Sequence, residues 1–590
     1  MNKPFSGKKS ALAIAVSSIL ATGTPAALAQ LEEVIVTAQK REQNLIDVPI
    51  SIATLSGERF TAIFEGGADI RALSARVPSL YVESSNGRVA PRFYIRGLGN
   101  SDFDLAASQP VSIIMDDVVK ENVVLKSFPL FDIDRVEVLR GPQGSLFGRN
   151  TTAGIVKFDS VKPSDETTGY VKIDAGSLGT LNVEAAIGGG LTDTLSGRIA
   201  VLSQNRDEYI DNGFTGETDQ YGDFTEKAIK GFLAWQATEN LDFLLGAHYR
   251  ENDGTAAMFR ANILTPGSNS LNENFDRETV FFDGGDGNRQ EYENTGINLK
   301  FNYDFGDLTL TSITAWEDAE GFSRGDIDGG NSVTGPGFIP FSSDTKDGID
   351  QLEQITQELR IANNDADKFF WQAGVYLFSS DFDITTDPGF ATATVNHTND
   401  AWAAFGQGDY SLSDALTLTA GLRYTYDEKE LTTAGFDDVE VDDSQWSGNL
   451  SLAYALSDNS NVWGKISNGF RGPTIQGRDV VFGGAPSVAD SETITAIEVG
   501  YKAEFWDNKA RLNAAIFYYE VEDQQLSAVG GGGNFIQLVN ADEGVGQGFE
   551  VDLDVAVNEY FSFTLGYAYS DTEIKDDDLL VGICAQCTVT

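Results

Sequence analysis

Few side chains in this sequence have the types and spacing that catalysis needs. The 590 residues include only two histidines, so a histidine general base would have to be His248 or His397. We find no H-E-x-x-H zinc motif and no plausible nucleophile–base–acid triad. The sequence therefore predicts that the protein is not an enzyme and has no catalytic residue, metal site or cofactor.

Two glycine-rich stretches resemble ligand-binding loops but lack the required spacing. A phosphate-binding loop needs G-x-x-x-x-G-K-[ST], whereas Gly144 to Gly148 encloses three residues and is followed by Arg149. The stretch Asp326 to Asn331 lacks the spacing and the closing glutamate of a calcium loop. We expect the first stretch to be a tight turn and the second to be a solvated loop.

The two cysteines, Cys584 and Cys587, form a single C-x-x-C motif near the end of the chain. A redox motif needs a strand-to-helix context, and a zinc site needs two more ligands, neither of which the sequence shows. A loop disulfide is the favoured state if the chain enters an oxidising compartment.

The first residues predict export. Lys8 and Lys9 precede an apolar run from Ala11 to Ala21, and Ala27-Leu28-Ala29 forms a small-x-small cleavage site. This run is about half of the roughly 20 residues that a membrane-spanning helix needs. We expect residues 1–29 to be a signal peptide.

Charge excludes one class of partner. The 89 acidic residues exceed the 41 basic ones and give a net charge of −48, which argues against nucleic acid. The simplest interpretation of the acidic excess is long solvated loops, such as the stretch from Asp437 to Asp443.

Two kinds of organisation follow one another along the chain. From about Lys40 to Val161 a helix-like stretch, Gly57 to Leu73, and short apolar runs at Val111–Met115 and Arg135–Leu139 predict a compact α/β unit. From Gly169 onward, strand follows strand.

The later strands alternate with a period of two residues over 10 or more positions. In the stretch that begins at Leu416, Leu and Tyr side chains fall on one face, and Thr, Gly, Arg423 and Asp427 fall on the other. Such length and polarity favour strands that cross a bilayer, with His248 facing the lumen. Tight turns at Glu239-Asn240 and Ser413-Asp414 alternate with long loops, for which we predict residues 253–294 and 319–350, and His397 is expected in an exposed loop. Candidate aromatic-girdle residues are Trp402, Trp463, Tyr518 and Tyr519.

Several motifs give the chain a family resemblance. These are EEVIVTA at Glu32–Ala38, VPSLYV at Val77–Val82, FYIRGLG at Phe93–Gly99, DIDRVEVLRGPQGSLFGRNTTAGIV at Asp132–Val156, AFGQGDYSLSDALTLTAGLRYTYDEK and NGFRGPTIQ. With them the chain resembles a TonB-dependent outer-membrane receptor. The resemblance implies a TonB-box segment at residues 30–40, an α/β plug domain at 41–163, and a transmembrane antiparallel β-barrel from residue 164 to residue 590 with the plug inside its lumen.

The resemblance also implies partners and a function. TonB, driven by its inner-membrane motor complex, would pair with the box as an added β-strand. The implied function is energy-coupled import across the bacterial outer membrane, with a ferric siderophore favoured over an oligosaccharide or another nutrient. A passive porin or adhesin barrel is the alternative of a different class. Outer-membrane lipid, lipopolysaccharide and the barrel-assembly machinery are the other expected partners of what we expect to be a monomer.

Site residues follow from the same resemblance. The predicted TonB-binding residues are Glu32, Glu33, Val34, Ile35, Val36, Thr37 and Ala38. The predicted structural residues of the plug are Arg96, Gly97, Arg140, Gly141, Gly144 and Gly148. The predicted ligand-binding residues are Arg88, Arg92, Asn100, Asp102 and Gln109.

The end of the sequence departs from the family pattern. A complete member has about 22 strands and an aromatic last residue, whereas the chain shows about 17 strands before Thr590. We expect a C-terminal truncation after the strand from Phe561 to Thr572, and hence a gap between the first and last barrel strands.

Overall fold

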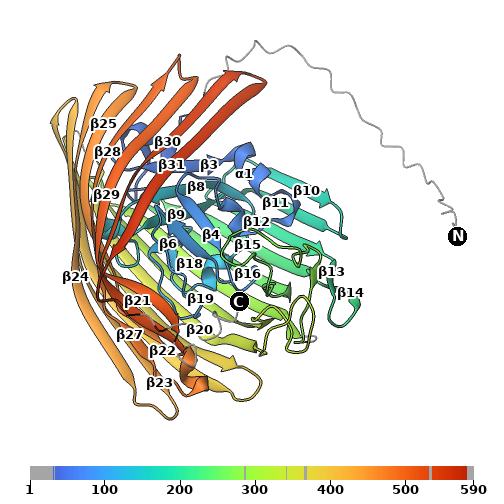
Figure 1. The fold of residues 1–590 in the computed structure, drawn as a ribbon. Coiled ribbons are helices and arrows are strands. Elements are labelled where there is room, and N and C mark those ends of the chain that lie inside the picture. The colour runs from blue at the N-terminus through green and yellow to red at the C-terminus, as the bar shows by residue number, and fades with distance from the viewer. Residues whose placement is uncertain are drawn as a thin grey trace, which may run out of the picture.

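A computed structural model places a small α/β unit inside one large curved sheet (Figure 1). It describes residues 31, 33–284, 287–340, 342–364, 368–530, 535–580 and 582. The predicted signal peptide, Glu32, Cys584 and Cys587 lie outside the described residues. Within these ranges no helix is long and apolar enough to cross a membrane.

The inner unit, which we call the plug, is built on a five-stranded sheet of order β3-β8-β9-β6-β7. In this sheet β6 and β9 are parallel, and the other neighbours are antiparallel. Its apolar side chains form a core with the plug helices and the inner wall of the large sheet. The plug elements are β1 (Ile35–Val36), β2 (Gln43–Asn44), η1 (Leu45–Asp47), β3 (Ile52–Ser56), α1 (Gly57–Ile63), η2 (Glu65–Gly67), η3 (Ile70–Leu73), β4 (Leu80–Glu83), β5 (Arg92–Ile95), β6 (Val111–Met115), β7 (Val118–Lys120), η4 (Leu125–Ser127), β8 (Ile133–Arg140), α2 (Gly144–Phe147) and β9 (Gly154–Ser160).

The predicted helix-like stretch is shorter than its pattern indicated. The α-helix ends at Ile63, and two 3-10 turns follow it. Gly66 and Gly67 have φ values of 73° and 79°, which lie in the left-handed region and interrupt a right-handed helix.

Among the described residues, the large sheet contains 17 strands, as the sequence predicted, and each is hydrogen-bonded to the next. Its members are β10 (Thr168–Ala175), β11 (Leu181–Thr192), β12 (Leu195–Arg206), β15 (Phe224–Thr238), β16 (Leu241–Thr255), β18 (Arg289–Asp304), β19 (Leu308–Asp326), β20 (Asp344–Asn363), β21 (Phe369–Asp387), β22 (Ala393–Ser413), β23 (Leu416–Thr433), β24 (Val439–Ser457), β25 (Ser460–Arg471), β28 (Glu492–Phe505), β29 (Ala510–Gly530), β30 (Phe535–Asn558) and β31 (Phe561–Lys575). Outside it lie β13 (Ile210–Asn212), β14 (Glu217–Tyr221) and β17 (Thr279–Val280), and the segment from β26 (Thr474–Gln476) through η6 (Arg478–Phe482) to β27 (Ser487–Ala489).

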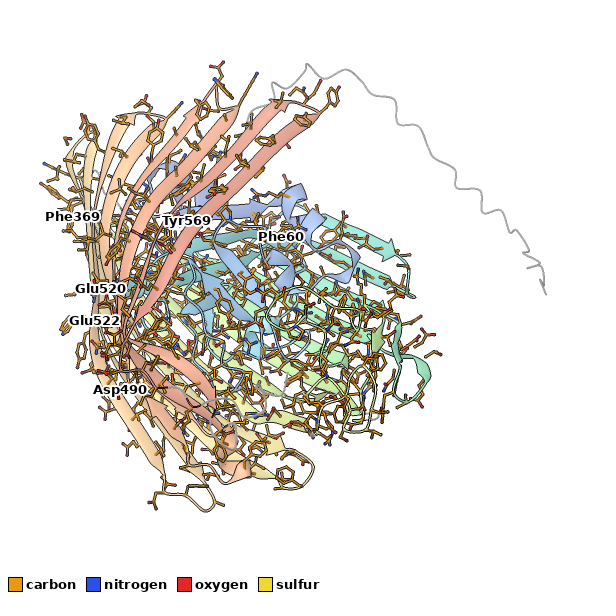
Figure 2. All side chains as sticks on the ribbon, viewed as in Figure 1. Phe60, Phe369, Asp490, Glu520, Glu522 and Tyr569 are labelled. Atoms are coloured by element: carbon orange, nitrogen blue, oxygen red, sulfur yellow. The ribbon has the colours of Figure 1, made fainter. Side chains whose placement is uncertain are left out.

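Alternation sorts the side chains of each strand between two environments. On β23, Leu422 is 53% exposed on the outer face, whereas Arg423, one position along, is 3% exposed against the plug. Figure 2 shows the same division: Phe60 of α1 lies inside the curve of the sheet, and Phe369 of β21 lies on the outside. The predicted polarity of these strands is confirmed.

Three details of the prediction are wrong, the first two because the strands are longer than expected and the third because two aromatic residues face inward. The long connections are shorter than expected, since β16 runs to Thr255 and β18 starts at Arg289, while β19 runs to Asp326 and β20 starts at Asp344. His397 is not in an exposed loop: it is a buried, inward-facing residue of β22. Trp402 and Tyr518 face outward, but Trp463 and Tyr519 occupy inward positions and are buried, so these two are not girdle residues.

The first and last strands of the large sheet differ from the others. Among the described residues, no hydrogen-bonded ladder joins β31 to β10. Nearly every residue of β31 is exposed, on both faces of the strand. This agrees with the predicted gap; the truncation itself stays a prediction.

Candidate functional site

The N-terminal segment lies at the end of the large sheet where the short turns connect the strands. The backbone N–H of Leu31 donates to the carbonyl of Asn508, in the short turn between β28 and β29, at 2.8 Å. Ile35 and Val36 form β1, which is antiparallel to Asn44 and Gln43 of β2. Short turns of outer-membrane barrels face the periplasm. In an outer-membrane barrel, the segment would thus lie at the periplasmic end.

The side chains of β1 divide between the plug and solvent. Val36 is completely buried in a small core, whereas Ile35 is 36% exposed. The backbone N–H and hydroxyl of Thr37 both donate to Glu137 of β8, at 2.8 and 3.1 Å. Lys157 of β9 donates to the same hydroxyl at 2.6 Å. The segment is therefore docked to the plug by one apolar side chain and one polar cluster.

Two basic residues directly after this segment attach it to the barrel wall. Lys40 forms an ion pair with Glu358 of β20, and Arg41 forms one with Asp409 of β22. Burial lowers the pKa of Lys40 to about 8, although the neighbouring Glu358 raises it. Sequence reasoning did not identify either anchor, because their partners are more than 300 residues away.

Arg96 and Arg140 fasten the plug to the opposite part of the wall. Arg96 is 2% exposed and donates to Glu550 at 2.9 and 3.0 Å and to Glu498 at 3.0 Å. Arg140 donates to Asp552 at 2.9 Å. Burial alone lowers the pKa of Arg96, but Glu550 and Glu498 raise it above its ordinary value. We call this cluster the arginine latch.

The predicted structural glycines lie where the plug approaches the barrel closely. A Cβ at Gly144 would lie 2.8 Å from the Ser447 side chain and 3.1 Å from the Cα of Gly469. At Gly148, with φ of 89°, it would lie 2.7 Å from Arg423. Gly97 and Gly141 show equally close approaches, each with a positive φ. These contacts fit the predicted structural role.

The predicted ligand-binding arginines have protein partners. Arg88 donates to the carbonyl of Gly67 and to Gln204, and its guanidinium lies 3.9 Å from the centre of the Phe224 ring. Arg92 makes a two-pronged pair with Glu83, at 2.5 and 2.7 Å.

The other three predicted ligand residues are buried in one plug loop. Asn100 donates to the Ser108 carbonyl at 2.7 Å, Asp102 accepts from Ser527 at 2.7 Å, and Gln109 donates to the Pro91 carbonyl at 3.1 Å. The structure therefore brings Asn100, Asp102 and Gln109 together and holds Arg88 apart from them. Their role in ligand binding stays a prediction.

Sequence reasoning missed a segment that covers this loop. The stretch β26–η6–β27 turns inward, and Arg478 lies over the Phe103 ring at 5.0 Å and pairs with Asp347 at 3.2 Å. Ile475 belongs to the same apolar cluster as Leu105 of the loop. The motif NGFRGPTIQ marked the start of this segment, but nothing in it indicated the inward turn.

An open cavity lies on the other side of the plug, at the outer ends of β12, β15 and β16. Its volume is about 700 Å³. Charged residues from plug and barrel line it, among them Asp69, Arg71, Glu83, Arg88 and Arg206.

Comparison with known proteins agrees with this geometry. The family model "TonB-dependent Receptor Plug Domain" matches residues 44–155, and the family model "TonB dependent receptor-like, beta-barrel" matches residues 232–583. The chain belongs to the TonB-dependent receptors. Both matches lie within the predicted plug and barrel, whose boundaries stay predictions.

Individual TonB-dependent receptors are similar over most of the chain. The pesticin receptor of Yersinia enterocolitica is 25% identical over 472 residues, which cover 76% of this chain and 65% of the relative. The chain thus spans less than two thirds of the length of that relative. The ferric yersiniabactin uptake receptor FyuA from Yersinia pestis superimposes with a TM-score of 0.75 at 20% identity, covering 90% of this chain and 80% of that one. The ferripyoverdine receptor of Pseudomonas aeruginosa, bound to ferripyoverdine, gives 0.70 at 14% identity, covering 94% and 77%.

These findings establish the fold and the location. The protein is an outer-membrane β-barrel that carries an N-terminal plug in its lumen, as expected for a TonB-dependent receptor.

Proposed function

We propose that the protein imports a scarce nutrient across the outer membrane, that TonB and its inner-membrane motor supply the energy, and that it is not an enzyme. The observation that carries this proposal is a plug that occupies the lumen and is fastened by the arginine latch, with a strand-forming segment at the periplasmic face. A passive porin needs an open lumen, and an adhesin needs neither a plug nor this segment. A plug held by buried ion pairs requires work to move it.

The geometry of β1 supports pairing with a TonB strand. The N–H of Leu45 donates to the carbonyl of Val34. The backbone N–H and C=O groups of Val34 and Val36 therefore point toward β2. Because such groups alternate along an antiparallel strand, the N–H of Ile35 points to the opposite edge. This edge is the one that an added strand would use.

We propose a ferric siderophore as the substrate class. The relatives include receptors named for ferric yersiniabactin and ferripyoverdine. The open outer cavity offers space for a small molecule of this kind, and Arg88 is the predicted ligand residue that lines it. An oligosaccharide or another nutrient is the alternative, which uptake assays with a panel of iron chelates and glycans would distinguish.

A proline substitution at Ile35 tests the coupling. Proline removes the N–H on the outer edge and leaves the bonds between β1 and β2 in place, because the Ile35 N–H does not point at β2. We expect Ile35→Pro to abolish uptake of radioactive iron from the panel in iron-starved cells, and Ile35→Val, the matched control, to keep it.

A second proline variant separates pairing from docking. Val36→Pro removes a bond to β2 and a buried side chain, so it should abolish uptake and also loosen the segment, as seen by faster proteolysis after Lys40 or Arg41. Uptake that survives Ile35→Pro at wild-type level, or that is equal in cells with and without TonB, would overturn the proposal.

A further inference from the structure

Two small cavities lie between the plug and one part of the barrel wall. Strands β20 to β23 line the outer cavity, and β19, β20, β21 and β23 line the inner one. The outer cavity, of about 50 Å³, is lined by plug residues 105–108 and 121–122 together with Gln354, Ser380, Asn399 and Lys429. The inner cavity, of about 30 Å³, is lined by Thr37 and Lys40 of the N-terminal segment together with Glu358, Tyr376 and Arg423. Each has room for a few water molecules.

The strand registers show how close the two cavities are. Gln354, Ser380, Asn399 and Lys429 lie opposite one another in one row across the four strands. The next inward-facing row toward the periplasm is Thr356, Phe378, Ala401 and Asp427, and the row after that contains Glu358 and Tyr376. Since a strand rises about 3.3 Å per residue, successive inward-facing rows lie roughly 7 Å apart. Thr356 of the middle row already lines the inner cavity, so the two cavities are lined by adjacent rows.

Arg149 of the plug occupies this middle row. Its guanidinium lies 4.6 Å from the centre of the Phe378 ring and pairs with Asp427 at 3.2 Å. It also donates to Asn399 at 2.8 Å and pairs with Glu121 at 3.3 Å, and both of these residues line the outer cavity. The Arg149 side chain therefore lies between the residues that line the two cavities.

Buried polar atoms without partners continue along the same line. In the part of the chain that the structure describes, no hydrogen-bond partner is found for Nε2 of His397, Oδ2 of Asp427 or Oη of Tyr376. His397 lines the outer cavity, Asp427 lies in the middle row, and Tyr376 lines the inner cavity. Buried polar atoms of this kind are normally satisfied by ordered water. The line from His397 to Tyr376 is thus built for hydration.

The side chains around the two cavities carry a net positive charge, whereas the whole chain has a net negative charge. The two cavities and the row between them contain six basic residues and four acidic ones, whereas the whole chain has 41 basic and 89 acidic residues. The basic residues are Lys40, Arg149, Lys157, Arg360, Arg423 and Lys429. Such a lining favours a ligand that carries negative charge.

We propose that the imported ligand is an anion that crosses between the plug and strands β20 to β23, and that Arg149 is the gate of this path. The inference rests on the proposed function. The arginine latch holds the plug on β28 and β30, whereas the pairs Lys40–Glu358 and Arg41–Asp409 on β20 and β22 are made by the N-terminal segment and break when that segment is pulled. Pulling the N-terminal segment withdraws Thr37 and Lys40 from the inner cavity, and Arg149 is then the remaining barrier.

A cysteine at Thr356, which lines the inner cavity, reports on the gate without TonB or any nutrient. Cys584 and Cys587 are replaced by serine, and cells that lack general porins are treated from outside with the anionic thiol reagent 2-sulfonatoethyl methanethiosulfonate. We expect slow labelling in Thr356→Cys and at least tenfold faster labelling when Arg149→Ala is added. Arg149→Lys should restore the slow rate, because the cation remains.

Two matched controls separate a gate from general loosening of the plug. Arg198→Ala removes an arginine that is equally buried in an ion pair, with Asp132, away from the path, and should leave labelling at Thr356→Cys slow. Asn513→Cys, a plug-facing position on β29, should label equally with and without Arg149→Ala.

The outcomes decide the proposal. An unchanged rate at Thr356→Cys, or an equal rise at Asn513→Cys, overturns the gate; Arg149→Gln takes the place of Arg149→Ala if the alanine variant does not reach the membrane. A cationic methanethiosulfonate reagent that labels faster than the anionic one, each relative to free cysteine, overturns the assignment of an anion. None of the labelling experiments depends on TonB. A result that overturns the gate is therefore distinct from survival of uptake in Ile35→Pro, which would overturn the proposed function.

Discussion

Replacing Arg96 by methionine tests whether the arginine latch holds the plug in place. The substitution removes three hydrogen bonds, two to Glu550 and one to Glu498, and leaves both carboxylates buried. Arg140 remains 3.7 Å from Glu550 and compensates only part of its charge. Methionine keeps the apolar stem and the Cβ of the side chain, so the positive φ of 55° at this position is the same in both proteins.

The expected loss of stability follows from the burial of these groups. Removing one partner of a buried ion pair costs about 3–5 kcal/mol. If the plug opens locally at this cluster, the change corresponds to roughly 10²- to 10⁴-fold faster hydrogen exchange, at about 1.4 kcal/mol for each factor of ten. The effect should appear in β5, which Arg96 directly follows, and in its partner β4.

Hydrogen exchange of the purified full chain, read by mass spectrometry, measures this effect. Adding Glu498→Gln and Glu550→Gln to Arg96→Met removes the unpaired charges and should recover most of the protection. The reasoning is refuted if exchange in β4 and β5 changes less than about threefold, or if the triple variant exchanges as fast as Arg96→Met.

Two further predictions concern the plug. Gly144→Ala should destabilise the plug by about 1–3 kcal/mol, because the new methyl group would lie 2.8 Å from the Ser447 side chain, and Ser447→Gly should relieve most of the loss in thermal unfolding. An additive effect of the two changes would contradict this. Burial, together with the charge of Asp102, raises the pKa of Asp104 to about 7 from the usual 3.8. Between these pH values Asp104 is therefore protonated in the folded protein and ionised in the unfolded chain. The stability of loop 100–109 should therefore fall as the pH rises from 4 to 7, by an amount on the order of 4 kcal/mol, and hydrogen exchange of the loop in Asp104→Asn should lose this pH dependence. An unchanged pH profile in Asp104→Asn would exclude Asp104 as its source.

The sequence predicted which residues face inward, because alternation along a strand depends only on local pattern. Arg423 and Asp427 were assigned to the lumen face on this ground, and both are buried there. It did not predict their partners: Arg96 meets Glu550 across 454 positions of the sequence, and no local pattern records such a pair.

The errors had physical causes of the same kind. His397 lies in a polar stretch that reads as a loop, but β22 continues through it because the plug and the facing strands bury one of its faces. The motif NGFRGPTIQ was identified only as part of the family resemblance, and the inward course of the chain after it depends on the apolar plug loop that Ile475 meets.

The inward fold of β26–η6–β27 limits which of the outward connections of the barrel can vary in sequence. We expect substitutions in the outward connections at residues 259–284 and 327–340 to affect the plug less, because these residues lie beyond the ends of the barrel strands. The residues of β26 and η6 lack that freedom, because Ile475 and Arg478 are packed against plug loop 100–109. We therefore expect substitutions to be tolerated better in the outer connections than in this segment, where each substitution also alters packing against the plug.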